Sequence, residues 1–185
     1  MKLTTGIIRN LNKQVDVDHK DSKKVALSWL REQGLINEQP QEASGENDDE
    51  KPEIVVGGKN FTEQYILSEM AAALLEQAGY SVELKTGVGS VIARKSLVND
   101  QIDLYYEYTG TAYTVFHEQK DPEIMSDPVK VYEWVSNKDK EAGLVWLERV
   151  SFNNTYTLLM RKTQAQEFGI SSISDLADKV TTKSD

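Results

Sequence analysis

The sequence predicts an α/β fold built on a mainly parallel sheet, and three observations support this prediction. From Glu53 onward, short apolar runs typical of strands alternate with longer amphipathic runs typical of helices. Glycines follow several of these runs, and capping residues such as Ser90 and Pro128 stand where helices are expected to begin. Alternation at this spacing indicates βαβ units, whose ligands sit beyond the carboxyl ends of the strands.

The first 36 residues predict helices but no independent core. A helix is expected over residues 22–33, with Asp21 or Ser22 as its N-cap. A shorter helical turn is expected over residues 6–12, followed by an extended segment over residues 14–17. The apolar face of the longer helix would contain Val25, Ala26, Trp29 and Leu30. Because this set is too small to fold alone, we expect the segment to pack on the rest of the chain.

Residues 37–52 are predicted to form a flexible acidic linker. Ala43 is their only apolar residue apart from glycine and proline, and six carboxylates against Lys51 give a local charge of -5. Such a composition cannot offset the entropy lost on ordering. The whole chain carries a formal charge of -9, so about -4 remains elsewhere. This balance argues against nucleic acid or an anionic membrane as a partner.

From residue 53 the expected elements follow one another closely. Strands are expected at residues 54–56, 81–86, 102–106, 145–147 and 155–160. Helices are expected at residues 62–78, 91–98, 109–116, from Pro128 to Gly143, and near 174–178. The loops after the first three strands, residues 57–62, 87–90 and 107–111, should therefore converge on one rim. The Gly-Val-Gly of residues 87–89 lacks the further signature of a phosphate loop and predicts a tight turn in which Ser90 caps a helix.

Residues 103–111 combine three tyrosines, two carboxylates and a Thr-Gly-Thr corner. Tyrosine faces attract cations such as trimethylammonium, although aromatic residues also simply fill pleated surfaces. If the strand extends far enough, Tyr106 and Tyr108 share one face and Tyr105 points to the other.

An enzyme is not expected. The chain has no cysteine, and no activated nucleophile or metal-binding set occurs in order, so neither a cofactor nor a metal is predicted. A calcium-like run at residues 16–21 lacks the required glycine and glutamate. If the chain were an enzyme, Glu63, Asp103 and Glu107 would be its acid–base candidates. No apolar window reaches the length of a membrane span, and no signal peptide is recognised.

Four motifs occur in order: Gly-Gly-Lys-Asn-Phe-Thr-Glu-Gln at 57–64, Gly-Val-Gly-Ser at 87–90, the tyrosine-rich run at 102–111, and Phe-Asn-Asn-Thr-Tyr at 152–156. Over residues 54–180 this series resembles the substrate-binding proteins of osmoprotectant ABC importers, which serve glycine betaine, choline, carnitine or ergothioneine. The resemblance implies a three-layer, periplasmic-binding-protein-like (type II) lobe, an extracytoplasmic parent, and non-catalytic delivery of a betaine-like solute to an ABC permease subunit. A targeting segment is then absent from this chain.

In that family two lobes close on the ligand with an aromatic cage and polar groups for its carboxylate, and the resemblance carries these roles to matching positions here. Tyr108 is the leading cage residue and Tyr106 the second, with Asp103 or Glu107 adding polar contacts. The start of the helix at residue 62 could hold the carboxylate, or Asn60 or Thr62 could simply cap it. The expected ligand-binding residues are Asn60, Phe61, Thr62, Glu63, Gln64, Ser90, Asp103, Tyr106, Tyr108, Thr109, Gly110, Asn153, Asn154 and Tyr156, of which the last three either touch the ligand or satisfy hinge backbone.

The order of the segments is unusual. Residues 7–36 resemble the carboxyl-terminal end of the same family domain, yet they precede its beginning, and the second lobe expected after about Lys162 is missing. We therefore interpret residues 1–36 as a C-terminal segment packing on lobe one, 37–52 as a linker, and 53–185 as the N-terminal part of a circularly permuted domain. The alternatives are a junction fragment of tandem binding domains, or a partner-binding scaffold without ligand affinity.

Overall fold

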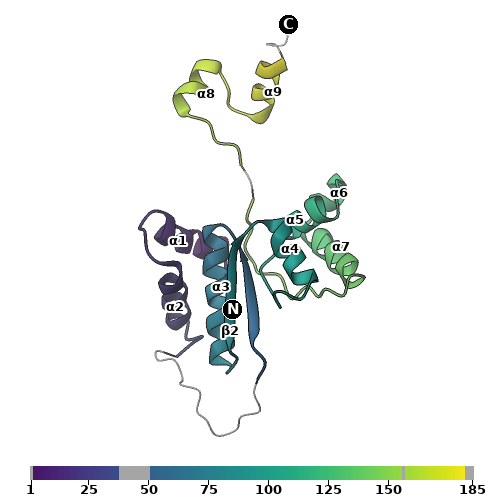
Figure 1. Cartoon of the computed structure of the whole chain (residues 1–185). Coiled ribbons are helices and arrows are strands. Elements are labelled where there is room, and N and C mark those ends of the chain that lie inside the picture. Colours follow the sequence, from purple (N-terminus) through teal and green to yellow (C-terminus); the bar gives the residue numbers. More distant parts are fainter. Residues whose placement is uncertain (1, 38–50, 156, 182–185) are drawn as a thin grey trace. The chain divides into compact units, whose positions relative to one another are not determined.

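The computed structural model describes residues 2–37, 51–155 and 157–181 (Figure 1). The chain divides into two units, Met1–Phe152 and Asn153–Asp185. The larger unit contains, in chain order, α1 (Thr5–Asp16), α2 (Ser22–Glu32), β1 (Ile54–Lys59), α3 (Thr62–Gln77), β2 (Val82–Val88), α4 (Ser90–Val98), α5 (Thr109–Thr111), the π-helix η1 (Ala112–Phe116), α6 (Pro122–Met125) and α7 (Pro128–Lys140). Structural similarity reported below confirms the predicted α/β class with a parallel sheet.

The sheet is parallel but smaller than expected. β1 pairs with β2 from Ile54 opposite Val82 to Lys59 opposite Val88. The expected third strand at residues 102–106 is reduced to one parallel bridge between Val56 and Leu104. There the Gly57 N–H donates to the Leu104 carbonyl at 2.8 Å. The chain therefore runs beside β1 only briefly.

Two glycines lie inside β1 rather than ending it, which corrects the predicted strand end at residue 56. A Cβ on Gly58 would lie 2.5 Å from the Ser68 hydroxyl and 2.8 Å from the methyl of Thr86. A Cβ on Gly57 would collide with Ile102. Glycine is needed at both positions because side chains of α3, β2 and the segment after α4 lie so close to β1.

α1 and α2 pack against α3, on the side of α3 away from the sheet (Figure 1). The shared apolar cluster consists of Leu3, Ile8, Leu11, Val25, Ala26, Trp29, Leu30, Ile66, Leu67, Met70 and Ala73. The four apolar residues predicted for α2 are all buried, and Asp21 caps this helix by accepting a hydrogen bond from the Lys24 N–H at 3.0 Å. The predicted extended segment at 14–17 is wrong up to Asp16, because Val15 sits one turn beyond Leu11 and packs on the same cluster.

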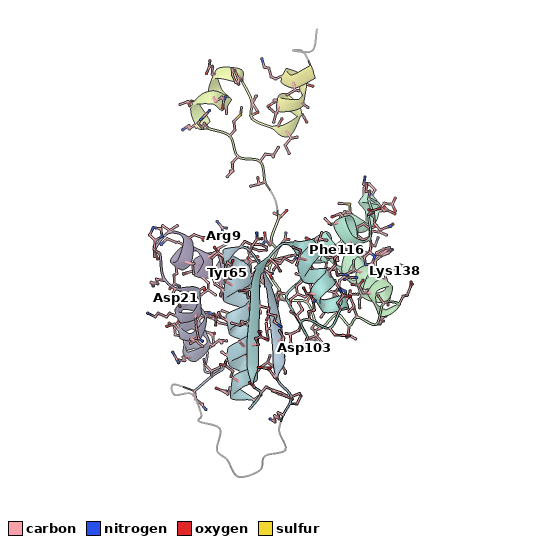
Figure 2. All side chains as sticks on the ribbon, in the orientation of Figure 1. Arg9, Asp21, Tyr65, Asp103, Phe116 and Lys138 are labelled. Carbon is pink, nitrogen blue, oxygen red and sulfur yellow. The ribbon has the colours of Figure 1, made fainter. Side chains whose placement is uncertain are left out.

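α4, η1 and α7 lie on the other side of the sheet, where Figure 2 labels Phe116 and Lys138. Asp139 is fully buried at their centre and accepts two hydrogen bonds from Arg94, at 2.5 and 2.7 Å. The Trp146 indole N–H also donates to it at 2.6 Å, and His117 Nε2 lies 2.8 Å away. This carboxylate joins three helices to the segment after α7.

The remaining predictions for the larger unit hold in part. A helix begins at Pro128 as expected, capped by Asp127, and ends at Lys140. The helix expected over residues 109–116 is present, with its last five residues in π-helical geometry. The predicted strand at residues 145–147 is wrong: Val145 and Leu147 are each 76 % exposed, and the segment is fixed by side-chain contacts instead of strand pairing. α6, a four-residue turn, was too short to be predicted.

The smaller unit contains α8 (Lys162–Phe168) and α9 (Ile173–Thr181). α8 ends at Gly169 in the left-handed conformation, and Asp175 accepts hydrogen bonds from the backbone of Ser171 and Ser172 at the start of α9. Of the strand predicted at residues 155–160, Tyr156 lies outside the described residues and the others are not in a strand. Across the described ranges, none of the helices combines the length and apolarity needed to cross a membrane.

Leu30→Ala should lower the free energy of unfolding by about 2–5 kcal/mol, because Leu30 has no exposed surface in the cluster that joins α2 to α3. Urea denaturation followed by tryptophan fluorescence would measure this change. Arg31→Ala is the matched control on the exposed neighbouring position and should change stability by less than about 0.5 kcal/mol. Equal stability of the two variants would contradict a shared core.

Asp139→Asn should lower the free energy of unfolding by about 3–5 kcal/mol, because it leaves the Arg94 guanidinium without its buried partner. Burial alone would raise the pKa of Asp139, but hydrogen bonds from Arg94, Trp146 and His117 outweigh burial and hold the pKa below its usual value. The stabilisation is thus present above the ordinary aspartate pKa and is lost as the pH falls through the depressed value. Urea titrations at neutral and strongly acid pH should show the difference from wild type shrinking in acid, whereas Glu133→Gln, on the exposed face of α7, should show little effect at either pH.

Candidate functional site

Three loops meet where β1 and β2 end, which confirms the predicted convergence. Lys59, the last residue of β1, lies opposite Val88, the last residue of β2. The Asn60 N–H donates to the Val88 carbonyl at 3.0 Å. From the third segment, the Glu107 carboxylate forms an ion pair with the Lys59 ammonium. We call these three loop segments, residues 57–64, 87–90 and 105–111, the rim.

The ion pair at the rim is almost completely shielded from water. The Lys59 side chain is 2 % exposed and that of Glu107 is 7 % exposed. Glu107 also accepts hydrogen bonds from the Tyr108 N–H and the Tyr105 hydroxyl, each at 2.7 Å. Burial lowers the pKa of Lys59, and the neighbouring carboxylate partly offsets that effect. Burial and the Glu107 charge together raise the pKa of Tyr105, so its phenol stays neutral and donates.

Tyr108 stands at the centre of the rim. Its ring centroid lies 4.8 Å from the Lys59 ammonium and 5.9 Å from the centroid of Phe61, with 31° between the two ring planes. Its hydroxyl donates to Glu63 Oε1 at 2.6 Å and accepts from Gln64 Nε2 at 3.1 Å. Of the residues predicted from sequence, the structure therefore brings Phe61, Glu63, Gln64 and Tyr108 together.

The first turn of α3 is not capped by Asn60 or Thr62, as one of the two hypotheses for this helix start required. Its N-cap is Phe61, which offers no side-chain hydrogen bond there, so neither Asn60 nor Thr62 caps the helix. The Thr62 hydroxyl instead donates to Asp16 of α1 at 2.5 Å. Glu63 and Gln64, both buried, turn inward toward Tyr108. The start of α3 is thereby held by contacts from distant segments.

Other predicted residues lie apart from this cluster. The Asp103 carboxylate accepts from the Val55 N–H at 2.7 Å, near the opposite end of β1. Tyr106 packs against the apolar cluster of α1, α2 and α3, and burial raises its pKa. Ser90 is the first residue of α4, which is capped by Gly89, so the capping role predicted for Ser90 is wrong.

The last group of predicted residues divides between the two units. Thr109 and Gly110 open α5, and the Gly110 carbonyl accepts from Thr114 at 2.8 Å. Asn153 and Asn154 belong to the smaller unit and are exposed. Tyr156 lies outside the described residues.

Sequence reasoning missed Lys59 and Tyr105. Lys59 directly follows an apolar strand and two glycines, a pattern that indicates a buried charged side chain and that was visible in the sequence. Tyr105 was left out of the expected site because only Tyr106 and Tyr108 were assigned to the aromatic cage. Its hydroxyl instead reaches Glu107, the partner of Lys59.

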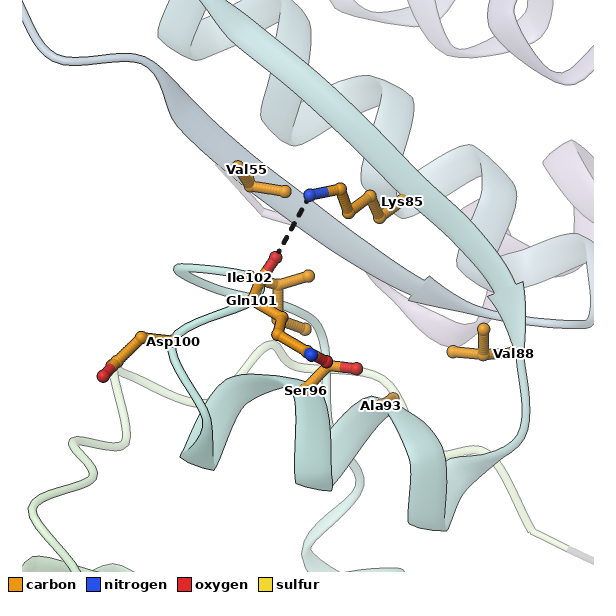
Figure 3. A pocket seen from close by; sticks show the side chains of 8 residues that line it. All are labelled: Val55, Lys85, Val88, Ala93, Ser96, Asp100, Gln101 and Ile102. Atoms are coloured by element: carbon orange, nitrogen blue, oxygen red, sulfur yellow. Dashed lines mark hydrogen bonds between the residues drawn. The ribbon is translucent and has the colours of Figure 1, made fainter.

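A separate groove of about 490 Å³ lies between the sheet and α4 (Figure 3). Val55, Val88, Ala93 and Ile102 give it apolar walls, and Lys85 crosses it to the Gln101 carbonyl at 3.5 Å. None of the residues predicted from sequence to bind a ligand lines this groove.

The rim combines charged groups with aromatic rings. The Lys59 ammonium pairs with the Glu107 carboxylate, and a second carboxylate, that of Glu63, accepts from the Tyr108 hydroxyl, so the formal charge of these three groups is negative by one. Phe61 is 38 % exposed and Tyr108 is half-buried, so aromatic surface is open to solvent beside that charge. Aromatic faces and excess negative charge both favour an organic cation.

Comparisons with known proteins agree on one family. The model of the substrate binding domain of ABC-type glycine betaine transport systems matches residues 52–185. The glycine-betaine-binding protein of Pseudomonas aeruginosa is 43% identical over 122 residues, covering 66% of this chain and 38% of that protein. The ergothioneine transport permease/ergothioneine binding protein EgtU of Helicobacter pylori is 37% identical over 131 residues, covering 70% of this chain and 23% of that protein.

A solved structure shares the fold. Apo YehZ from Escherichia coli superimposes with a TM-score of 0.54 at 26% sequence identity, covering 72% of this chain and 48% of that one. The chain thus spans less than half the length of each of these proteins.

Glu107→Gln should lower the free energy of unfolding by about 3–5 kcal/mol, because the buried Lys59 ammonium loses its counter-charge. Adding Lys59→Met should recover part of that loss, since the double variant leaves no unpaired buried charge. Chemical denaturation of the four proteins in the cycle measures the coupling. Glu83→Gln is the control: it breaks the exposed ion pair with Lys85, in which the charged atoms lie 3.2 Å apart, and should lower the free energy of unfolding by at most about 1 kcal/mol. If the stability losses of the Lys59 and Glu107 variants were strictly additive, the buried pair would be contradicted.

Proposed function

Because the chain belongs to the family of substrate-binding domains of ABC-type glycine betaine transport systems, we propose that it is the solute-binding lobe of an importer receptor. Its ligands are quaternary-ammonium or betaine-like compounds such as glycine betaine, choline, carnitine or ergothioneine. The lobe captures the solute without chemical change, and its parent acts outside the cytoplasm and delivers the solute to an ABC permease subunit. The names of the relatives support this class, since they are binding proteins for glycine betaine and ergothioneine.

The arrangement around Tyr108 is the observation that carries the proposal. The ring is fixed through its hydroxyl by Glu63 and Gln64, and Phe61 extends the aromatic surface toward solvent. A ring that is held in place loses little freedom when a cation docks on it, so more of the attraction appears as affinity. Because the Lys59 charge balances that of Glu107, Glu63 supplies the excess negative charge near a docked trimethylammonium group.

We further propose that the rest of the predicted set completes the site around this centre. Asn60, Thr62, Ser90, Thr109 and Gly110 belong to the loops or helix starts of the same rim. Asp103 and Tyr106 support it from within the lobe, through the Val55 backbone and the α1–α3 cluster. Asn153, Asn154 and Tyr156 would belong to the crossover toward the second lobe of the parent receptor.

Residues 1–36 are proposed to be the carboxyl-terminal segment of the family domain, moved to the front and joined through residues 37–52. Two observations support this. The family match begins at residue 52, and residues 1–36 contribute seven of the eleven buried residues in the cluster that they share with α3. Residues 53–185 then correspond to the first lobe as far as the crossover.

Titration of the ¹⁵N-labelled chain with glycine betaine, choline, L-carnitine and ergothioneine tests the function. At least one compound should shift amide signals of the rim in a saturable way. Tyr108→Ala should weaken that binding by roughly 0.5–2 kcal/mol, the contribution of one aromatic face to a cation. Tyr108→Phe keeps the ring and tests the hydroxyl separately.

Tyr80→Ala is the matched control, because Tyr80 follows the far end of α3 and its ring faces Lys51. It should leave the titration unchanged. Absence of rim shifts with all four compounds at millimolar concentration would refute solute binding by this lobe. Equal weakening by Tyr108→Ala and Tyr80→Ala would refute the central place of Tyr108.

A further inference from the structure

We propose that Asn12 of α1 is a positioning residue for the ring of Tyr108, acting through Glu63. This inference rests on the proposed function and deepens it. It assigns a part of the binding site to residues that precede the match to the family model, which begins at residue 52.

The connection consists of two hydrogen bonds in series. Asn12 Nδ2 donates to Glu63 Oε2 at 3.4 Å. The other oxygen of the same carboxylate, Oε1, accepts from the Tyr108 hydroxyl at 2.6 Å. The plane of a carboxylate is set by the donors on both its oxygens, so the donor from α1 helps to fix the direction in which Glu63 holds the phenol.

A second contact ties the same two helices together one turn further along α1. The Thr62 hydroxyl donates to Asp16 Oδ1 at 2.5 Å, and Asp16 follows Asn12 by four residues on the same face. The first turn of α3, which carries Glu63 and Gln64, is therefore held against α1 at two points. The orientation of Tyr108 depends on that turn, because Glu63 and Gln64 each form a hydrogen bond with its hydroxyl.

Asn12 is poorly explained as a purely stabilising residue. Among the described residues, its Oδ1 is the one buried side-chain nitrogen or oxygen without a hydrogen-bond partner. A buried acceptor left unpaired costs stability, and an apolar side chain of similar volume would remove that cost. Departures from the rule that buried polar atoms are paired concentrate at functional sites. The amide is thus suited to orienting Glu63 at some expense in stability.

The test compares Asn12→Leu with Asn10→Leu in the full chain. Asn10 is exposed on the same helix and accepts only from Gln14 within α1, at 3.1 Å. Three quantities are measured: the melting temperature, the ¹H–¹³C signals of the Tyr108 ring in tyrosine-labelled protein, assigned with Tyr108→Phe, and the affinity for glycine betaine. Asn12→Gln keeps the donor on a longer arm and serves as the rescue variant.

Asn12→Leu should remain folded, shift the Tyr108 ring signals beyond any shift in Asn10→Leu, and weaken glycine betaine binding roughly 2- to 10-fold, the size of one net hydrogen bond. Asn12→Gln should move the ring signals back toward wild type. The inference is overturned if Asn12→Leu leaves the ring signals where Asn10→Leu leaves them, or if it shifts them only together with a general loss of folded structure. If wild type does not bind glycine betaine, the proposed function has failed for that solute, and the ring signals still decide the role of Asn12.

Discussion

The apolar contact between α3 and the helices α1 and α2 is the constraint on which the rest of the structure depends. α3 is buried on two sides, with Ile66, Met70 and Ala73 toward α1 and α2 and Ser68 against the backbone of β1. A helix that is apolar on two sides needs a packing partner on each of them. β1 and the first 36 residues are therefore both stabilised by contact with α3. Removing α1 and α2, or β1, would expose a continuous apolar surface of α3. Residues 1–36 are therefore part of the fold.

The position of α3 also determines the electrostatics of the rim. α3 approaches β1 closely at Gly58, and the next residue of β1, Lys59, is buried, so its charge must be balanced by a nearby carboxylate. Glu107 provides that balance and at the same time holds the phenol of Tyr105 and the backbone of Tyr108. Core packing and the arrangement of the aromatic rings are therefore linked through one buried charge pair.

Much of the fold could be predicted because it follows from local patterns. α2, α3, α4 and α7 carry periodic apolar faces or recognisable capping residues, and their centres were predicted correctly. The errors share a cause: burial and pairing are decided by distant segments. Val145 and Leu147 look like strand residues but find no partner strand among the described residues, and the strand expected at residues 102–106 is reduced to one bridge with β1. In the site, Phe61, Glu63, Gln64 and Tyr108 could be predicted from motifs, whereas the contribution of Asn12 depends on how α1 packs and is invisible in the sequence.

Under the proposed function, the rim alone would bind a solute only weakly. Ligand sites usually bury most of the ligand surface, and one open face of two rings covers only part of a trimethylammonium group. With about 0.5–2 kcal/mol for each ring, two rings supply a few kcal/mol, against a larger loss of translational and rotational freedom. Tight binding then requires a second surface opposite Phe61 and Tyr108. What the first lobe can contribute alone is pre-organisation, and the hydrogen bonds from Glu63 and Gln64 to one phenol hydroxyl provide it before any ligand arrives.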